Sequence, residues 1–287
     1  MALCSAGLTG TGGSHDKYVP EIWSKRVQSA FEKQTVAKSH LLDLSELLTG
    51  QGGDAIHVPK LANRTATTRT LTTLSQITPA GSTEDGFDMN VQTWVIDPEA
   101  VSDALSAQTK IFQFSQIDSK MQSSIAVKFD TDMWANYSSL TLTAQGTDDG
   151  ATQATPDNIF DALQLLDSND NPKEDRVIVL TPKTYWAFVK NNVIPSGDYS
   201  SNKAKETGLI ATLGGVPVVM SNNLPTAAGG SKVNLVLHKE AIAYAIAQPA
   251  RVRMEHALDY LSTIVVGDML YGSGCYRTTA GVAVYGL

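Results

Sequence analysis

The feature that most constrains this fold is an amphipathic stretch near the start of the chain with no apolar neighbour in the sequence. Residues 19 to 44 read VPEIWSKRVQSAFEKQTVAKSHLLDL, and Pro20 followed by Glu21 favours a helix that begins near residue 20. At the helical period, its apolar side chains form one broad stripe. The stripe comprises Trp23, Val27, Ala30, Phe31, Ala37, Leu41, Leu44 and Leu48. Because the sequence that follows is polar, this stripe must pack on a distant segment or on another chain.

The next segment, 51–97, is rich in threonine and too poor in large apolar residues to form a core of its own. AIHVPKL reads as a short strand in which Pro59 indicates a sheet edge or a strand end, and MNVQTWVI reads as a second strand. Two strands alone are marginally stable in water. We therefore expect a long β-rich excursion that leans on another part of the protein.

A long helix is predicted after this excursion. Asp97, Pro98 and Glu99 form the pattern of a helix start, and the helical signal resumes in SQIDSKMQSSIAVKFDTDMWANY. Apolar side chains recur there every four residues, at Ile117, Met121, Ile125, Phe129 and Met133. Such a row winds slowly around a straight helix, so different neighbours should cover its two ends. We expect a structural spine.

Helix and strand patterns alternate in the middle of the chain, which indicates an α/β unit. Thr155 and Pro156 start the helix DNIFDALQLLD, RVIVL is a buried strand, and KTYWAFVKN is a second helix. The glycine pair Gly214–Gly215 then turns the chain into the strand VPVVM. From STIVVGDMLYGSG to the end, β-branched and aromatic residues alternate with glycine turns, so the last part should be a β layer.

Composition excludes several classes of protein. The 287 residues are 42% hydrophobic and carry a net charge of -7, without a run of Lys or Arg that would grip nucleic-acid phosphates. Cys4 and Cys275 lie at opposite ends of the chain, which does not resemble a disulfide framework. The start MALCSAGL lacks the basic region of a signal peptide, and no apolar run is long enough to span a membrane. We expect a protein made in the cytoplasm.

The sequence offers no catalytic, cofactor-binding or metal-binding pattern. The five histidines have no ligand spacing, and GLTGTGG lacks the Lys-Ser/Thr of a phosphate loop. Asp130 and Asp132 lie two apart on the predicted spine, so their side chains should diverge and be solvated. Asp148-Asp149-Gly150 reads as a turn rather than as a calcium loop. We predict that the protein is not an enzyme.

An assembly protein is the best remaining hypothesis. The chain combines a polar arm, an amphipathic stretch without a local partner and a threonine-rich hairpin without a core. Monomers rarely expose so much adhesive surface, so these segments should contact copies of the same chain.

The order of these parts resembles the major capsid proteins of tailed bacteriophages, which have the Hong Kong 97 fold. The resemblance rests on VPEIWSKRVQSAFEKQTVAKSHLL with GGDAIHVPKL, on LGGVPVVMSNNLP, and on the closing GDMLYGSGCYRTTAGVAVYG. It implies an α+β fold with an N-terminal arm, an extended E loop, a P domain that holds the spine helix, and a central α/β A domain. The implied ranges are 1–50 for the arm, 51–97 for the E loop, 98–140 with 251–287 for the P domain, and 141–250 for the A domain.

The resemblance also implies a function. Hexamers and pentamers of the chain would form an icosahedral shell around double-stranded DNA, which it would touch loosely and without sequence preference. Implied partners are copies of itself, a portal protein, a separate scaffolding protein and a decoration protein, with no membrane and no cofactor. Candidate inter-subunit contacts are Trp23, Phe31, Leu41, Lys60, Arg64 and Arg69.

Some members of the family cross-link an E-loop Lys to a P-domain Asn of a neighbour. Lys60 is the only lysine in 51–97, whereas 251–287 contains no Asn and leaves Asn136 alone in the predicted P domain. We expect no such cross-link.

Three alternatives stay open at this point. An encapsulin-like nanocompartment shell shares the implied fold, although the long threonine-rich excursion favours a virus. A phage tail component would also self-associate. An α/β enzyme built around RVIVL and VPVVM would need converging polar groups at the strand ends, which the sequence does not show.

Overall fold

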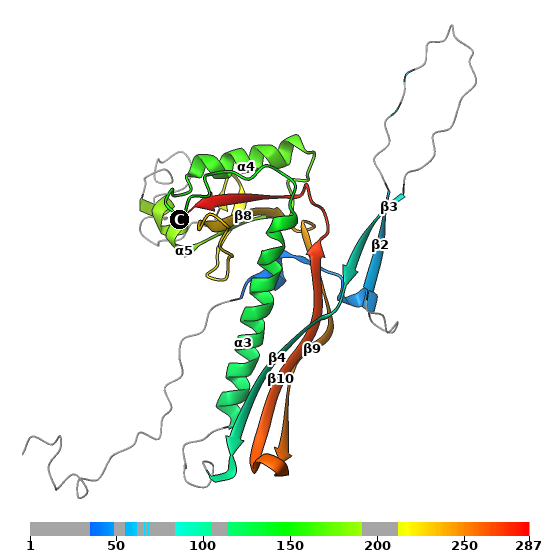
Figure 1. Ribbon diagram of the computed structural model, residues 1–287. Helices are drawn as coiled ribbons and strands as arrows, with labels where there is room; N and C mark the ends of the chain where they lie inside the picture. Colours follow the sequence, from blue (N-terminus) through cyan, green and yellow to red (C-terminus); the bar gives the residue numbers. More distant parts are fainter. Residues whose placement is uncertain are drawn as a thin grey trace, which may run out of the picture.

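The chain forms a head of sheet and helices at one end of a long stalk, with a hairpin projecting from their junction (Figure 1). The computed structural model describes residues 35–48, 55–61, 66, 68, 84–104, 114–190 and 212–286. Its helices are α1 Ala37–His40, α3 Phe114–Ala135, α4 Pro156–Ser168 and α5 Pro182–Lys190, with 3-10 helices η2 Ser45–Leu48, η3 Asn136–Ser139 and η4 Leu258–Tyr260. Its strands are β1 Leu42–Asp43, β2 Ala55–Leu61, β3 Glu84–Asn90, β4 Thr93–Ser102, β5 Arg176–Leu180, β6 Thr212–Leu213, β7 Val216–Met220, β8 Lys232–His238, β9 Ile242–Ala257, β10 Ser262–Cys275 and β11 Gly281–Gly286.

The stalk consists of helix α3 packed along a four-stranded sheet of order β1-β9-β10-β4. The predicted spine is confirmed, because Met121, Ile125, Phe129 and Met133 are all buried. Its two ends have different neighbours, as the four-residue spacing predicts. Near the start of α3, a side chain at Gly267 of β10 would meet Ile125 and Met121, whereas Met133 packs in a cluster that includes strands of the head.

The head contains a five-stranded sheet of order β11-β8-β5-β7-β6. Strand β5 is buried throughout and pairs with β7 in parallel, which confirms the predicted α/β unit. Helix α4 begins as predicted, since the Thr155 hydroxyl accepts from the Asn158 N–H and the Asn158 side chain accepts from the Thr155 N–H. Gly214 and Gly215 both have positive φ, which a turn at this position requires.

The predicted helix start at Asp97, Pro98 and Glu99 is wrong. These residues lie within β4, whose residues pair with β10, for example Pro98 with Val266. Because β4 is at the edge of its sheet, the missing N–H of Pro98 is tolerated there. Asp97 instead accepts a hydrogen bond from the hydroxyl of Ser124 on α3 and so ties the strand to the spine.

The helix predicted for residues 19 to 44, with a stripe that reaches Leu48, also differs from the structure where it is described. Helix α1 ends at His40, Leu41 is extended, and β1 pairs with β9 in parallel. The Leu44 N–H donates to the carbonyl of Tyr244 at 2.8 Å. Pairing with a strand 200 positions further along the chain therefore overrides the local helical periodicity.

The last strand departs from the implied ranges. Residues 251–287 were expected in the P domain, yet β11 pairs with β8 in the five-stranded sheet of the head. Gly281 and Gly286 allow close packing there, because a Cβ at either would lie 2.4–2.5 Å from atoms of Leu237 or Ala154.

The projecting hairpin is formed by β2 and β3, which pair antiparallel from Ala55–Asn90 to Leu61–Glu84. Its base leans on the stalk as expected, since Ile56, Phe87 and Met89 form a buried cluster with Ala243 and Ala245 of β9. Residues 69–83, between the two strands, lie outside the described part of the chain.

Candidate assembly interface

Asp130 of α3 is the centre of a buried polar cluster at which three parts of the chain meet. Its carboxylate accepts hydrogen bonds from the backbone N–H groups of Val36 (2.9 Å) and Ala37 (2.7 Å), and from Trp134 Nε1 (3.1 Å). Asn223, in the loop after β7, donates a fourth through Nδ2 at 2.7 Å. The prediction that Asp130 is solvated is wrong, since the residue is 0% exposed. These donors replace the lost hydration of the carboxylate and hold α1 and the head against the spine.

Asp132 also serves the packing of the stalk. Its carboxylate accepts from the hydroxyl of Tyr271 on β10 at 2.6 Å and from Lys128 Nζ at 2.6 Å. Burial, followed by the hydrogen bond to Asp132, raises the pKa of Tyr271. Tyr271 is fully buried and its ring stands edge-on to Phe129 at 4.9 Å between centroids. The two aspartates therefore diverge as predicted, but each of them binds a different part of the fold.

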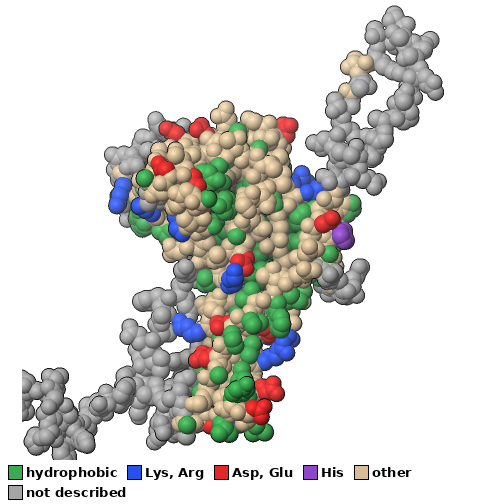
Figure 2. Space-filling model, viewed as in Figure 1, with side chains coloured by type: hydrophobic (Ala, Val, Ile, Leu, Met, Phe, Trp, Pro, Cys, Tyr) green, Lys and Arg blue, Asp and Glu red, His purple; other side chains and the backbone are tan. Residues whose placement is uncertain are grey.

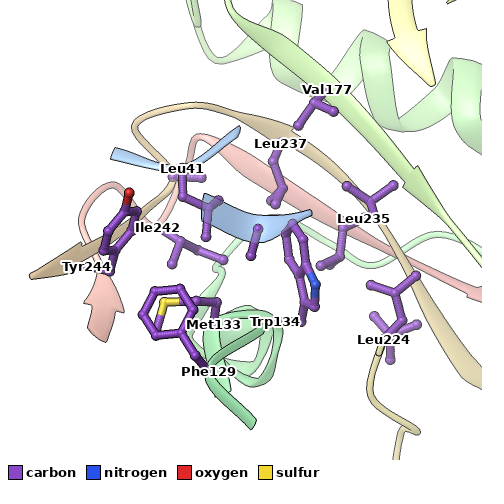
Figure 3. Close-up of a cluster of buried hydrophobic side chains, with 14 of the residues drawn as sticks. Leu41, Phe129, Met133, Trp134, Val177, Leu224, Leu235, Leu237, Ile242 and Tyr244 are labelled. Atoms are coloured by element: carbon purple, nitrogen blue, oxygen red, sulfur yellow. The ribbon is translucent and has the colours of Figure 1, made fainter. Parts of the chain in front are cut away.

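Of the six predicted contact residues, only Leu41 and Lys60 fall within the described residues. Leu41 is 2% exposed and packs among Phe129, Met133 and Tyr244 (Figure 3). It is covered by its own chain, so the prediction of an inter-subunit contact at Leu41 is wrong. The turn from α1 into β1 directs this side chain inward. Trp23, Phe31, Arg64 and Arg69 lie outside the described residues.

Lys60 holds the hairpin onto the end of β10. Its Nζ donates to the carbonyl of Tyr276 and lies 4.6 Å from the centroid of the Tyr276 ring and 5.5 Å from that of Phe87. The two rings stand edge-on, 5.2 Å apart. Asn136 is engaged within its own chain too, through a 3.0 Å bond from Nδ2 to the Ser273 hydroxyl. Both candidate partners of the cross-link considered above therefore make contacts within their own chain.

The open face of the four-stranded sheet carries a second charged cluster, around Asp268 of β10. Because Gly267 faces α3, the side chain of Asp268, the next residue in the strand, points away from α3. The Asp268 carboxylate accepts from Arg251 (2.9 and 3.1 Å) and from Arg253 (3.0 Å). Gln248 (2.8 Å) and Trp94 (3.4 Å) donate as well. Asp268 is 2% exposed, whereas its arginine partners are half-exposed. The buried carboxylate is therefore surrounded by guanidinium groups that solvent can reach.

Besides Met254 of β9, the described part of the stalk exposes large apolar side chains in two groups. Trp94 (64% exposed) and Ile96 (53%) of β4 lie beside the Asp268 cluster, on the same face of the sheet. Leu258, Tyr260 and Leu261 form the tip of the β9–β10 hairpin and are 66–77% exposed. Figure 2 shows hydrophobic side chains gathered at this far end of the stalk. Leu261 also has a φ of 44, an unfavourable conformation for a leucine.

The Asp268 cluster predicts a dependence of stability on acid. Burial alone would raise the pKa of Asp268, but hydrogen bonds from Arg251, Gln248 and Trp94 outweigh it and hold the pKa below its ordinary value. A lowered pKa stabilises the fold above the unfolded value of about 3.9, and this contribution is lost as the pH falls through the folded pKa. We expect the free energy of unfolding, measured with urea, to fall below about pH 4, and to fall less in Asp268→Asn. An Asp268→Asn variant with the same acid slope as the wild type would contradict this role, and Asp118→Asn on the surface of α3 is the control.

Other kinds of site find no support in the described part of the chain. No three His, Cys, Asp or Glu side chains gather there in a way that could hold a metal ion. None of the described helices is both long and apolar enough to cross a membrane. The Asp130 cluster is buried, whereas the Asp268 cluster lies beside the exposed apolar side chains Trp94 and Ile96.

Comparison with known proteins decides between the remaining hypotheses. The model of the Gp10A-like family, described as major capsid protein, matches residues 99–269, which include the spine helix, the long strand β9 and the head apart from β11. The chain belongs to this family. It is a shell protein of a phage head, and it assembles from copies of itself as part of the virion. The nanocompartment, tail and enzyme alternatives are not favoured. No curated protein matches the chain.

Solved structures show that the major capsid protein has the Hong Kong 97 fold. A chain of Mycobacterium phage Che8 aligns with a TM-score of 0.79 at 21% identity, and the alignment covers 93% of this chain and 97% of that one. The capsid of cyanophage P-SCSP1u gives 0.77 at 21% identity, covering 97% and 96%. The mature capsid of bacteriophage PhiM1 gives 0.72 at 18% identity, covering 93% and 91%. The fold class predicted from the sequence is confirmed.

Sequence reasoning missed both buried aspartates. Asp130 is distinguishable in hindsight, because Trp134 lies one helical turn further along and has an indole N–H that needs a partner when buried. Asp268 stands in an alternating strand whose pairing partners include Arg251, but that register follows only from the sheet. The exposed tip residues gave no local signal either.

Proposed function

We propose that this capsid protein forms hexamers and pentamers that close into an icosahedral shell around double-stranded DNA. The observation that carries the proposal is the exposed apolar surface at both Trp94–Ile96 and the β9–β10 tip, on a stalk whose core is otherwise well covered. Monomeric proteins rarely leave such patches open. Distinct patches on one rigid stalk allow each subunit to contact several neighbours, and weak contacts add up over a shell.

The proposal assigns roles to the segments that extend from the body. The β2–β3 hairpin would lie across a neighbouring subunit, and the N-terminal arm would run beneath others. Trp23, Phe31, Arg64 and Arg69 remain proposed contacts in these two segments, and Lys60 is proposed to act by fixing the base of the hairpin. Support for this last role comes from the contacts of Lys60 with Tyr276 and Phe87.

Because the proposed particle is a phage head, we also propose further partners. A separate scaffolding protein would guide closure in the host cytoplasm, a portal protein would occupy one vertex, and a decoration protein could bind the outer surface. The DNA contact would be loose, because a net charge of -7 disfavours tight binding of phosphates. The role is structural, without a reaction or a cofactor.

Electron microscopy of the expressed protein tests the proposal. The full-length chain is produced alone and together with a candidate scaffolding protein, and the particles are examined by negative stain. Closed shells of uniform diameter are expected when the scaffold is present. A chain that stays monomeric at high concentration in both cases, or that forms open tubes, would contradict a shell-forming role.

A further inference from the structure

Helix α5 presents a basic and aromatic stripe to solvent. Lys183, Trp186 and Lys190 are three and four residues apart, so they share one side of the helix. The opposite side is buried through Thr184, Tyr185 and Phe188. Trp186 is 47% exposed and borders a shallow hollow lined by Gln153, Pro182 and Ala187. Both lysines are exposed, and neither forms an ion pair within the described residues.

Helix α4 presents an acidic stripe. Asp157, Asp161, Gln164 and Ser168 follow one another at intervals of four, three and four residues and are all exposed. The other side of α4 is buried through Ile159, Ala162 and Leu166. Asp167, on the flank of the helix, is paired with Arg176 at 2.6 Å, whereas neither Asp157 nor Asp161 has a cationic partner in the described part of the chain. Two carboxylates are thus left for an external partner.

The lysines of the α5 stripe and the aspartates of the α4 stripe do not pair with each other within the subunit. Both helices cover the same side of the five-stranded sheet, because their buried faces belong to one apolar cluster with Ile178, Leu180 and Val236. Their exposed stripes face outward. In Figure 2, Lys and Arg side chains gather at the edge of the head near α5, and Asp and Glu side chains lie along its upper edge near α4.

We propose that the α5 stripe of one subunit docks on the α4 stripe of a second copy. The proposal rests on the shell-forming function and names one contact within it. Two lysines match two carboxylates, and Trp186 supplies the apolar anchor that such contacts need. Because the contact joins two different surfaces, it is heterologous and can close a ring of subunits around an axis. Exposed ion pairs are individually weak, so the charges chiefly set the register, while Trp186 supplies affinity.

Charge reversal with rescue tests this contact in the full-length protein co-expressed with its scaffold. Lys183→Glu combined with Lys190→Glu is expected to lower the yield of closed shells about tenfold, because like charges then face each other. Asp157→Lys combined with Asp161→Lys should do the same. The protein with all four changes should recover most of the wild-type yield, and Trp186→Ala should stay defective in both charge backgrounds.

Controls separate folding, net charge and assembly. Lys239→Glu changes the charge in the same direction on the exposed β8–β9 turn and should assemble normally. Circular dichroism of each subunit checks that the head is folded. Normal shells from either double reversal, or folded reversals without rescue by the fourfold swap, would overturn the proposed contact. Failure of the wild type to form shells would instead contradict the proposed function itself.

Discussion

Replacement of Asp130 by alanine is expected to destabilise the folded subunit by about 3–5 kcal/mol, because several buried donors would lose their acceptor at about 1–3 kcal/mol each. Four donors point at this carboxylate, at distances of 2.7–3.1 Å. Alanine would leave them buried without an acceptor, which costs more than the hydrogen bonds themselves contribute. Asp130→Asn should lose less, because the amide oxygen can still accept from two of the donors.

Urea unfolding of the unassembled subunit, followed by tryptophan fluorescence and circular dichroism, measures this loss. The indole of Trp134 donates to Asp130, so its emission also reports whether the cluster is intact. The matched control is Asp118→Ala on the same helix, where the carboxylate binds only the exposed Gln122 in the structure described, and a change within about 0.5 kcal/mol is expected. Equal stability of Asp130→Ala and Asp118→Ala would show that the buried cluster does not hold the subunit together.

The accuracy of the sequence-based predictions follows from where the stabilising contacts lie. Helix α4 was predictable because its determinants are local: Thr155 caps it, Pro156 starts it, and one buried face repeats at the helical period. Strand β5 was predictable for a similar reason, since RVIVL is apolar throughout and short. Local signals and tertiary packing agree in both elements.

In the incorrect predictions, local signals and tertiary packing disagree. Asp97 and Pro98 have the composition of a helix start, but ten successive residue pairs between β4 and β10 fix them in a strand. Leu41 has helical periodicity with Trp23 and Phe31, yet the parallel pairing of β1 with β9 turns it into the core. Three of the four donors to Asp130 come from residues 93 or 94 positions away. Periodicity and spacing contain no information about partners at that separation.

Two features were nevertheless predictable because the sequence shows segments without an apolar partner nearby in the chain. A threonine-rich hairpin without its own core must lean on other parts of the protein, and its base does so through Ile56, Phe87 and Met89. The same reasoning predicted self-association, because apolar surface without a local partner needs an external one. The exposed apolar residues that the structure shows, such as Trp94 and Tyr260, are not those of the predicted stripe and were not predicted from the sequence.

The second large effect is expected at Gly272 of β10, where the base of the hairpin crosses the stalk (Figure 1). A Cβ at this position would lie 2.5 Å from the carbonyl oxygen of Asn90 and 2.9 Å from Cα of Val91. Both are backbone atoms at the junction of β3 and β4, so relief requires a movement of the chain and not a change of rotamer. Gly272→Ala should therefore cost about 1–3 kcal/mol of stability and tilt the hairpin away from the stalk.

We expect Gly272→Ala to impair shell assembly more than it impairs folding of the subunit. The β2–β3 hairpin projects from the junction of head and stalk (Figure 1), so a tilt at its base displaces the ends of the two strands at Leu61 and Glu84 more than the base itself. We expect Gly272→Ala subunits to fold, as judged by circular dichroism, but to give few closed shells by sedimentation and negative stain. Gly86→Ala in β3 is the matched control, because the nearest atom to its Cβ would be 3.8 Å away and its φ is not positive. Shells of normal yield from Gly272→Ala would show that neighbouring subunits accept the hairpin over a range of angles, and the position of its base would then not determine the contact.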